Sequence, residues 1–412
     1  MSSLGAVVWN GENGTLSGCN FINNSGTSGS GLFWNDTNGV ITDSNFVNNN
    51  HSWGALSLQG TNCKVSNCYF INNTSIHGGG GIDNNGKAKN CKLTNCTFIG
   101  NTAETGGGFY GGSVNVLLIN CTFIDNTAEL GGAVFLTSKN INGTVTGCTF
   151  SNNAANNEGG ALYWQGVNGT VTGCTFSNNS AYNYAGAIAW EGVNGTLNDS
   201  KFINNNANVN GGAIHWWGLD GILSSSVFID NHANNAGGSI YWQGVNGTVT
   251  GCNFTGNTAK GSGGAIQWWN PNGTLTDCIF TDNIANGNGG AIWWGNNNGV
   301  VNNSTFIGNI ANKLGGAVYW SGTESNMNEC NFKDNHGLHG DNVYWIWTVD
   351  DFLNKYSQIN DLDYVLIKNG IGTPSRTIVL NKKGITISSE GNVIFDAKGG
   401  NLHFEVTGDN VL

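Results

Sequence analysis

The chain has 412 residues with a formal net charge of −11 at pH 7, and charged residues make up only 10% of it. It therefore lacks the clustered Lys and Arg that contact phosphates, which excludes a nucleic-acid partner. A content of 65 Gly often indicates disorder, but 15 Trp and 19 Phe supply the apolar area of a folded core.

The sequence contains no run of roughly 18 apolar residues that would form a membrane-spanning helix. Residues 5–9 already lie in the middle of a repeat, and residues 391–412 end without a capping element. We therefore expect a monomeric fragment of a longer protein, with its export signal and its membrane or cell-wall anchor in the missing parts. The neutral polar composition, rich in Asn, Ser, Thr and Gly, favours an extracellular location at the cell surface.

A Phe recurs at one phase along most of the chain. The gaps between these Phe residues are 25, 24, 28, 25 and 27 residues, and then 26 residues seven times. The positions are Phe21, Phe46, Phe70, Phe98, Phe123, Phe150, Phe176, Phe202, Phe228, Phe254, Phe280, Phe306 and Phe332. An Asn stands three residues after each of them, from Asn24 to Asn335. A fixed period in this range indicates one structural unit stacked many times.

One unit holds three strand-like pieces, for example residues 161–164, 170–172 and 174–176. Each piece is too short for a helix and is rich in β-branched or aromatic residues, and Asn168-Gly169 marks a turn between the first two. The pattern predicts an all-β fold, a parallel β-helix of about 13 coils with about 26 residues and three short strands per coil. We expect this domain to span residues 1–345.

In-register coils would place equivalent residues about 4.8 Å apart, which turns each phase into a ladder of stacked side chains. Cys or Ser stands two residues before the Phe, and alternation places both on the inside. The cysteines of this ladder are Cys19, Cys68, Cys96, Cys121, Cys148, Cys174, Cys252, Cys278 and Cys330. Two more cysteines, Cys63 and Cys91, lie one coil apart, and a disulfide or a metal site between them stays open.

A Trp ladder lies in the first strand-like piece, two residues after its Ile, Leu or Val, and alternation predicts that it also faces inward. Its members are Trp9, Trp34, Trp164, Trp190, Trp216, Trp242, Trp268, Trp294, Trp320 and Trp345. The neighbouring positions would then face outward and mix aromatic rings with amides and carboxylates, a combination suited to sugars. These candidate ligand-binding residues are Tyr163, Gln165, Glu191, His215, Trp217, Tyr241, Gln243, Trp269, Trp293 and Tyr319. The alternative, that these residues only shield the strands beneath them, stays open.

Catalysis in a polysaccharide-degrading enzyme would require two carboxylates about 5–10 Å apart. The acidic residues of the repeats are scattered, and Glu191 stands alone among the candidate residues. We therefore expect no catalytic residues, no cofactor and no bound metal. A polysaccharide lyase or glycoside hydrolase and a purely structural surface stalk are the alternatives to a binding protein.

Residues 346–412 depart from the repeat. Residues 349–359 have helical spacing, with Asp350 near the start, and strand-like runs follow at 364–367, 377–380, 385–387 and 392–395. We expect a small cap or linker with one short helix, or the opening coils of a second β-helix module.

Two motifs recur in phase, Gly-Gly-Ala-Ile/Val/Leu and Phe-x-x-Asn. The first begins at Gly131, Gly159, Gly211, Gly263, Gly289 and Gly315. Together the motifs resemble the repeats of polymorphic outer membrane proteins and, still more, the adhesin-like surface proteins of methanogenic archaea. The resemblance implies a right-handed parallel β-helix of the pectate-lyase-like class, displayed on a cell surface. It also implies adhesion, with a carbohydrate or a surface protein of another cell as the partner.

Overall fold

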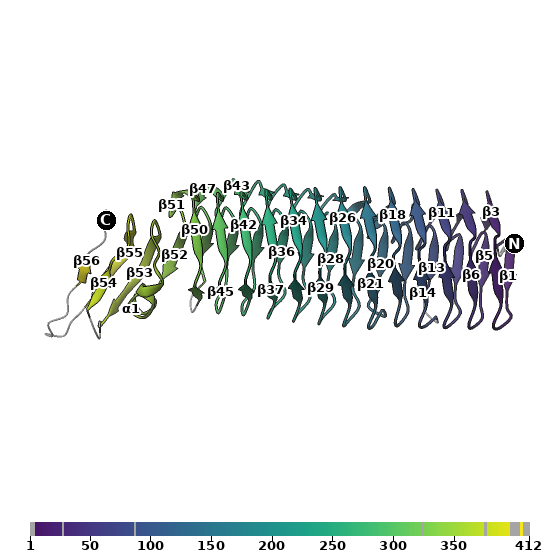
Figure 1. Ribbon diagram of the computed structural model, residues 1–412, viewed down its shortest axis with the longest axis horizontal. Coiled ribbons are helices and arrows are strands. Elements are labelled where there is room, and N and C mark those ends of the chain that lie inside the picture. Colours follow the sequence, from purple (N-terminus) through teal and green to yellow (C-terminus); the bar gives the residue numbers. More distant parts are fainter. Residues whose placement is uncertain are drawn as a thin grey trace. The chain divides into compact units, whose positions relative to one another are not determined.

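A computed structural model of the chain describes residues 5–26, 29–85, 88–322, 325–374, 377–395 and 404–406. The chain divides into two compact units, Met1–His232 and Ala233–Leu412. Both units are built from short parallel strands that follow one another in chain order within each sheet (Figure 1). The predicted all-β parallel β-helix is therefore confirmed, and each unit is described by itself below.

In the first unit, three parallel sheets each take one strand from every coil. The first-strand sheet contains β1 (Val7–Trp9), β5 (Leu32–Trp34), β9 (Leu56–Leu58), β13 (Ile82–Asn84), β16 (Phe109–Gly111), β20 (Val134–Leu136), β24 (Leu162–Trp164), β28 (Ile188–Trp190) and β32 (Ile214–Trp216). The second-strand sheet contains β2 (Thr15–Ser17), β6 (Val40–Thr42), β10 (Lys64–Ser66), β14 (Lys92–Thr94), β17 (Leu117–Ile119), β21 (Thr144–Thr146), β25 (Thr170–Thr172), β29 (Thr196–Asn198) and β33 (Ile222–Ser224). The third-strand sheet contains β3 (Asn20–Ile22), β7 (Asn45–Val47), β11 (Tyr69–Ile71), β15 (Thr97–Ile99), β18 (Thr122–Ile124), β22 (Thr149–Ser151), β26 (Thr175–Ser177), β30 (Lys201–Ile203) and β34 (Val227–Ile229).

The second unit repeats this arrangement. Its first-strand sheet contains β36 (Ile240–Trp242), β40 (Ile266–Trp268), β44 (Ile292–Trp294), β48 (Val318–Trp320), β52 (Val343–Trp347), β53 (Tyr364–Gly372) and β55 (Thr386–Phe395). Its second-strand sheet contains β37 (Thr248–Thr250), β41 (Thr274–Thr276), β45 (Val300–Asn302) and β49 (Asn326–Asn328). Its third-strand sheet contains β38 (Asn253–Thr255), β42 (Ile279–Thr281), β46 (Thr305–Ile307) and β50 (Asn331–Lys333).

A fourth short strand, which the sequence did not reveal, follows the ladder Asn in every repeat coil except that of Asn101, where Thr102 forms only isolated bridges. Up to the boundary between the units these strands are β4 (Ser25–Gly26), β8 (Asn50–His51), β12 (Thr74–Ser75), β19 (Thr127–Leu130), β23 (Ala154–Glu158), β27 (Ser180–Ala181), β31 (Asn206–Ala207) and β35 (His232–Ala233), which contains that boundary. In the second unit they are β39 (Thr258–Ala259), β43 (Ile284–Ala285), β47 (Ile310–Leu314) and β51 (His336–His339).

Strands pair residue to residue, so each phase of the repeat becomes a ladder in space. Phe150 pairs with Phe176, and their rings stack at 4.7 Å between centroids with planes 3° apart. Trp164 and Trp190 stack at 4.9 Å with parallel planes, and both indoles are fully buried. The inward orientation predicted for the Trp ladder is therefore confirmed.

The Asn-Gly turn is explained by the Trp ladder beneath it. Asn168 adopts the left-handed conformation with φ of 56°, which Asn tolerates better than most residues. A Cβ atom on the next residue, Gly169, would lie 2.4 Å from Cε2 of Trp164. Only glycine leaves room for the indole there, so the buried Trp five residues earlier requires the Gly of the turn.

The cysteines fill small buried sites, as the ladder interpretation predicts. Cys174 is buried, its thiol contacts the carbonyl oxygen of Thr172 at 3.3 Å, and its N–H donates to Oγ of Ser200 at 3.2 Å. Cys63 and Cys91 are free, buried thiols in the structure. No group of three or more His, Cys, Asp or Glu side chains is placed to hold a metal ion among the described residues.

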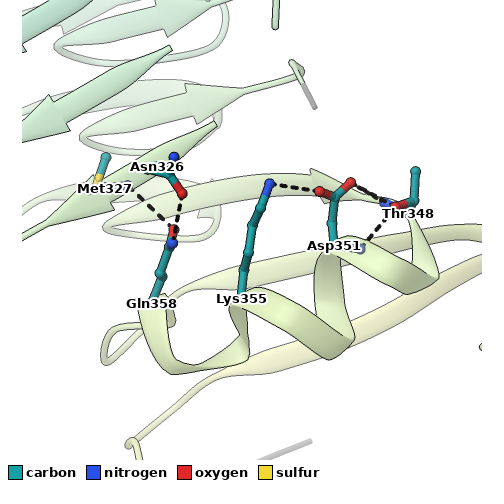
Figure 2. Close-up of polar contacts among 6 residues, drawn as sticks. All are labelled: Asn326, Met327, Thr348, Asp351, Lys355 and Gln358. Atoms are coloured by element: carbon teal, nitrogen blue, oxygen red, sulfur yellow. Dashed lines mark hydrogen bonds and ion pairs between the residues drawn. The ribbon is translucent and has the colours of Figure 1, made fainter. Parts of the chain in front are cut away.

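A helical segment follows β52 in the second unit, as predicted, and consists of α1 (Val349–Lys355) and the 3-10 turn η1 (Tyr356–Gln358). The helix is capped by Thr348, because Thr348 and Asp351 bond reciprocally in a capping box (Figure 2). Gln358 bonds to β49, the last strand of the second-strand sheet, where a further coil would otherwise pair. Its Nε2 donates to Oδ1 of Asn326 at 3.1 Å, and its Oε1 accepts from the N–H of Met327 at 3.4 Å.

The first-strand sheet continues past residue 345, since β52 pairs with β53 and β53 pairs with β55. The runs predicted at 385–387 and 392–395 form the single strand β55, and the run at 377–380 forms β54 (Ile378–Leu380), paired with β56 (Phe404–Val406). The domain boundary at residue 345 stays a prediction. None of the described helices is long and apolar enough to cross a membrane.

Candidate functional site

The central residue of each three-residue first strand points away from the Trp ladder and forms an outer row. In the first unit this row runs in register through Asp83, Tyr110, Phe135, Tyr163, Ala189 and His215. Residues from the loop after the fourth strand cover it: Tyr163 and Ala189 belong to a buried apolar cluster with Ala185, and Tyr184 lies edge-on to His215 at 5.1 Å. The row is thus the floor of a second apolar layer outside the strands.

This layer corrects part of the sequence-based expectation. Tyr163 and His215 in the first unit and Tyr241 in the second were expected to face solvent, but all three are buried. In the first unit the cause is the covering loop, because its Gly-Gly turn packs closely against the outer row of side chains. A Cβ atom on Gly159 would lie 3.2 Å from Cβ of Ala189. The rings of Tyr163, His215 and Tyr241 could therefore contact a surface ligand only through the few atoms that form the bottom of a binding site.

The residue after each inward Trp forms a second column, and this column is more accessible. Gln165, Glu191 and Trp217 occupy it on three successive coils, since Trp164, Trp190 and Trp216 pair in register. Glu191 is exposed, whereas Gln165 and Trp217 are partly exposed. An amide, a carboxylate and an indole therefore lie side by side on the surface of the first unit.

Glu191 is held from two sides. The hydroxyl of Tyr163 donates to its Oε1 at 2.5 Å, and Nε2 of Gln165 donates to its Oε2 at 3.0 Å. Burial, followed by the hydrogen bond to the Glu191 carboxylate, raises the pKa of the Tyr163 phenol, which therefore stays protonated as a donor. Burial and the charge of Glu191 also raise the pKa of Glu158, a partly buried residue of β23.

Trp217 is fixed by its neighbours. Its indole stacks on the buried imidazole of His215 with ring centroids 3.4 Å apart and planes 19° apart. Tyr184 approaches the same indole edge-on at 6.3 Å. The orientation of the Trp217 ring is thus set before any ligand arrives, which lowers the entropy lost on binding.

In the second unit, outer aromatic rings form a continuous stack. The ring centroids lie 5.2 Å apart for Trp269–Trp293, 6.2 Å for Trp293–Tyr319, 5.6 Å for Tyr319–Tyr344 and 4.8 Å for Tyr344–Tyr364. Burial raises the pKa of Tyr344, in the middle of this stack, to about 12. Rings stacked in this way cover each other's faces and leave mainly their edges for a ligand.

Trp269 ends this stack and differs from its other members. It is 45% exposed, and it follows Gln243, not a ring, in the column after the inward Trp. Gln243 is partly exposed, and its backbone carbonyl accepts a hydrogen bond from Nδ2 of Asn270. An aromatic ring beside amide groups is thus presented at one end of the stack.

The ten predicted residues fall into two separate groups of five, one in each unit. The prediction missed Glu158, the last residue of β23, and Tyr184, which lies in the loop after β27. The sequence of this part of the coil varies from coil to coil and shows no repeat phase. The only available signal was their position within two residues of the Gly159-Gly160 and Ala185-Gly186 pairs. The contribution of Tyr364 to the outer stack was also missed, because it follows the helix and stands outside the 26-residue phase.

Comparison with known proteins gives two family matches. The family described as "right handed beta helix region" matches residues 4–168 and 110–269, and the Chlamydia polymorphic membrane protein repeat matches residues 277–293. No curated protein sequence matches the chain.

Several solved structures are similar to the chain at low sequence identity. A double mutant of the periplasmic alginate epimerase AlgG has 10% identity and a TM-score of 0.40, with 92% of this chain and 77% of that chain covered. A double mutant of the tailspike protein of E. coli bacteriophage HK620 has 12% identity and a TM-score of 0.43, with 90% and 73% covered. PfbA, a surface adhesin of Streptococcus pneumoniae, has 11% identity and a TM-score of 0.31, with 79% and 83% covered. These similarities concern the fold alone, whereas the first family covers more than half of the sequence, and the chain belongs to the right-handed β-helix family.

Proposed function

We propose that the chain is the binding part of a cell-surface adhesin that attaches to glycans on other cells. The observation that carries this proposal is Trp269, a 45% exposed indole held at the end of an aromatic stack. Trp269 continues into the partly exposed rings of Trp293 and Tyr319, and adjoining exposed aromatic rings of this kind mark an interaction surface. The solved adhesin PfbA and the tailspike–pentasaccharide complex have the same kind of fold but carry no weight in the argument.

A sugar suits this surface better than a charged ligand does. The apolar face of a pyranose ring would rest on Trp269, and its hydroxyl groups would bond to amides such as those of Gln243 and Asn270. Because stacking on Trp293 fixes the indole, little side-chain entropy is lost when the sugar binds.

The test is a screen of the chain on an array of immobilised neutral and acidic oligosaccharides, with two variants beside it. Trp269→Ala should weaken binding by about tenfold or more, corresponding to about 1.4 kcal/mol. Ile279→Ala is the matched control, because Ile279 is also 45% exposed but lies on β42 in the third-strand sheet of the same unit. If the intact chain binds no glycan, or if Trp269→Ala binds as well as the intact chain, the structural stalk becomes the better explanation.

A polysaccharide-cleaving enzyme is the second candidate, and one observation favours it. Burial and the nearby charge of Glu191 raise the pKa of Glu158, which favours the protonated form of this carboxyl beside a second one. Such a pair has the chemistry of a general acid and its partner. Release of reducing ends from a polysaccharide, lost in Glu158→Gln while glycan binding is kept, would establish the activity.

A further inference from the structure

A polar groove lies in the first unit at the corner between the second-strand and third-strand sheets. Its volume is about 550 Å³, and it is lined by Asp43, Asn45, Asn67, Tyr69 and Asn95. Its residues are distinct from those of the first-strand surface described above.

The groove results from the conformation of the corner residues. Asp43, Asn67 and Asn95 occupy the corner on three successive coils with φ between 51° and 53°, in the left-handed region. A left-handed residue there turns the chain, and the corner side chains share one hollow with the outward side chains of the third strands, Asn45 and Tyr69. The repeat stacks this bend coil on coil and lengthens the hollow into a groove.

The polar groups of the groove are ordered by hydrogen bonds along the column. Nδ2 of Asn67 donates to Oδ1 of Asp43 at 3.1 Å, and Nδ2 of Asn95 donates to Oδ1 of Asn67 at 3.4 Å. In the part of the chain that the structure describes, these bonds use one N–H and one lone pair of the Asn67 amide, which leaves one of each for a ligand. Hydrogen bonds from Thr42 and Asn67 lower the pKa of Asp43, so its carboxylate is a permanent acceptor.

Tyr69 supplies an aromatic ring to this groove and is 48% exposed. Its neighbours in register are Asn45 and Thr97, which have small polar side chains. This arrangement is the reverse of the Phe and Trp ladders, where each ring is covered by the next. The ring of Tyr69 therefore has a face that a ligand can contact, and the amides of Asn45, Asn67 and Asn95 line the same groove.

We propose that this groove binds a segment of a neutral oligosaccharide, oriented along the stack of coils. The side chains of Asp43, Asn67 and Asn95 present hydrogen-bond donors and acceptors along the groove, and sugar hydroxyl groups can both donate and accept. The apolar face of a pyranose ring would pack on the ring of Tyr69. Anionic sugars are disfavoured because Asp43 is ionised and none of the five lining residues is cationic. The proposal rests on this groove alone and does not depend on the surface around Trp269.

Binding of neutral and uronic-acid-containing oligosaccharides to an array tests the proposal with the full chain and three variants. Tyr69→Ala should reduce the affinity for neutral oligosaccharides by about tenfold or more. Asn67→Gly should also reduce it, because glycine keeps the left-handed backbone and removes only the amide. Tyr182→Ala is the control, since Tyr182 is a 67% exposed tyrosine of the same unit that does not line the groove.

The outcomes separate this groove from the first-strand surface. Binding that falls in Tyr69→Ala and Asn67→Gly but survives in Tyr182→Ala supports the groove, whether or not Trp269→Ala also changes it. Binding that is unchanged in Tyr69→Ala, binding only of uronic-acid sugars, or no binding by the intact chain overturns the proposal. Thermal unfolding of each variant checks that the outward substitutions leave the fold intact.

Discussion

The buried Asn ladder makes the strongest prediction about stability, and Asn179 is a representative member. Its Nδ2 donates to the carbonyl oxygen of Phe150 at 3.1 Å and to Oδ1 of Asn205 at 3.0 Å. Its Oδ1 accepts from the N–H and from Nδ2 of Asn153, both at 3.0 Å. The substitution Asn179→Ala therefore removes four hydrogen bonds from a fully buried position.

The cost follows from what remains after the side chain is removed. The N–H of Asn153 loses its ladder partner, and a buried polar group without a partner costs about 1–3 kcal/mol. The other three bonds each contribute about 0.5–1.5 kcal/mol, and their remaining partners keep some bonds within the ladder. We expect Asn179→Ala to lower the free energy of unfolding by about 3–5 kcal/mol, a large share of the 5–15 kcal/mol typical of a folded domain.

Urea unfolding of the full chain measures this loss, and hydrogen exchange of the Asn153 amide localises it, because stacked coils can open locally. The control is Asn168→Gly, at the exposed Asn-Gly corner. Asn168 makes two side-chain bonds, at 3.1 and 3.2 Å, to the corresponding Asn residues of neighbouring coils, and glycine keeps its positive φ. This variant should lose less than about 1 kcal/mol. Equal losses in the two variants, or a loss below about 1 kcal/mol in Asn179→Ala, would refute the argument that burial makes the ladder strong.

Three further predictions concern single side chains. Burial raises the pKa of Asp83 from 3.8 to about 7, so the folded state binds this proton more tightly than the unfolded state does. The free energy of unfolding should therefore fall as the pH rises from about 4 to 7. Asp83→Asn should remove this decline and raise the free energy of unfolding by up to about 4 kcal/mol at pH 8, and an unchanged pH profile of unfolding would contradict it. Cys174→Ser should change the unfolding free energy by less than about 1 kcal/mol, because Ser200 already fills this position one coil later, whereas a loss above about 2 kcal/mol would show that the thiol packing matters. Thr348→Ala should cost about 1 kcal/mol by removing the capping box and should speed hydrogen exchange in α1, and unchanged exchange there would argue against the cap.

The core of this fold could be predicted from the sequence because stacking in register turns sequence period into spatial contact. Phe150 and Phe176 touch because they are 26 residues apart, and the same spacing joins Trp164 to Trp190. Alternation within three-residue strands then decides which side chains face inward. No long-range pairing had to be guessed, since the neighbour of every coil is the next coil along the chain.

The layer outside the first strands could not be predicted in the same way. The fourth strand is often only two residues long, as in β27, and two residues carry no alternation that could be recognised. The loop that follows differs in sequence from coil to coil, and so the cover that Tyr184 places over His215 has no repeated signature. The burial of Tyr163 and His215 was missed for this reason, whereas the accessibility of Glu191 and Trp269 did not depend on the loop.

The two proposed binding surfaces share one physical feature, the interruption of a ladder. A ring inside a ladder has a ring on either side, and its faces contribute to stability but are closed to a ligand. Trp269 ends the outer stack beside Gln243, and Tyr69 stands between Asn45 and Thr97. In a repeat protein of this kind, an aromatic face is accessible only where the neighbouring coils do not carry a ring at the same position. Residues at such interruptions should therefore be tested first for binding, and residues inside the ladders should be tested for stability.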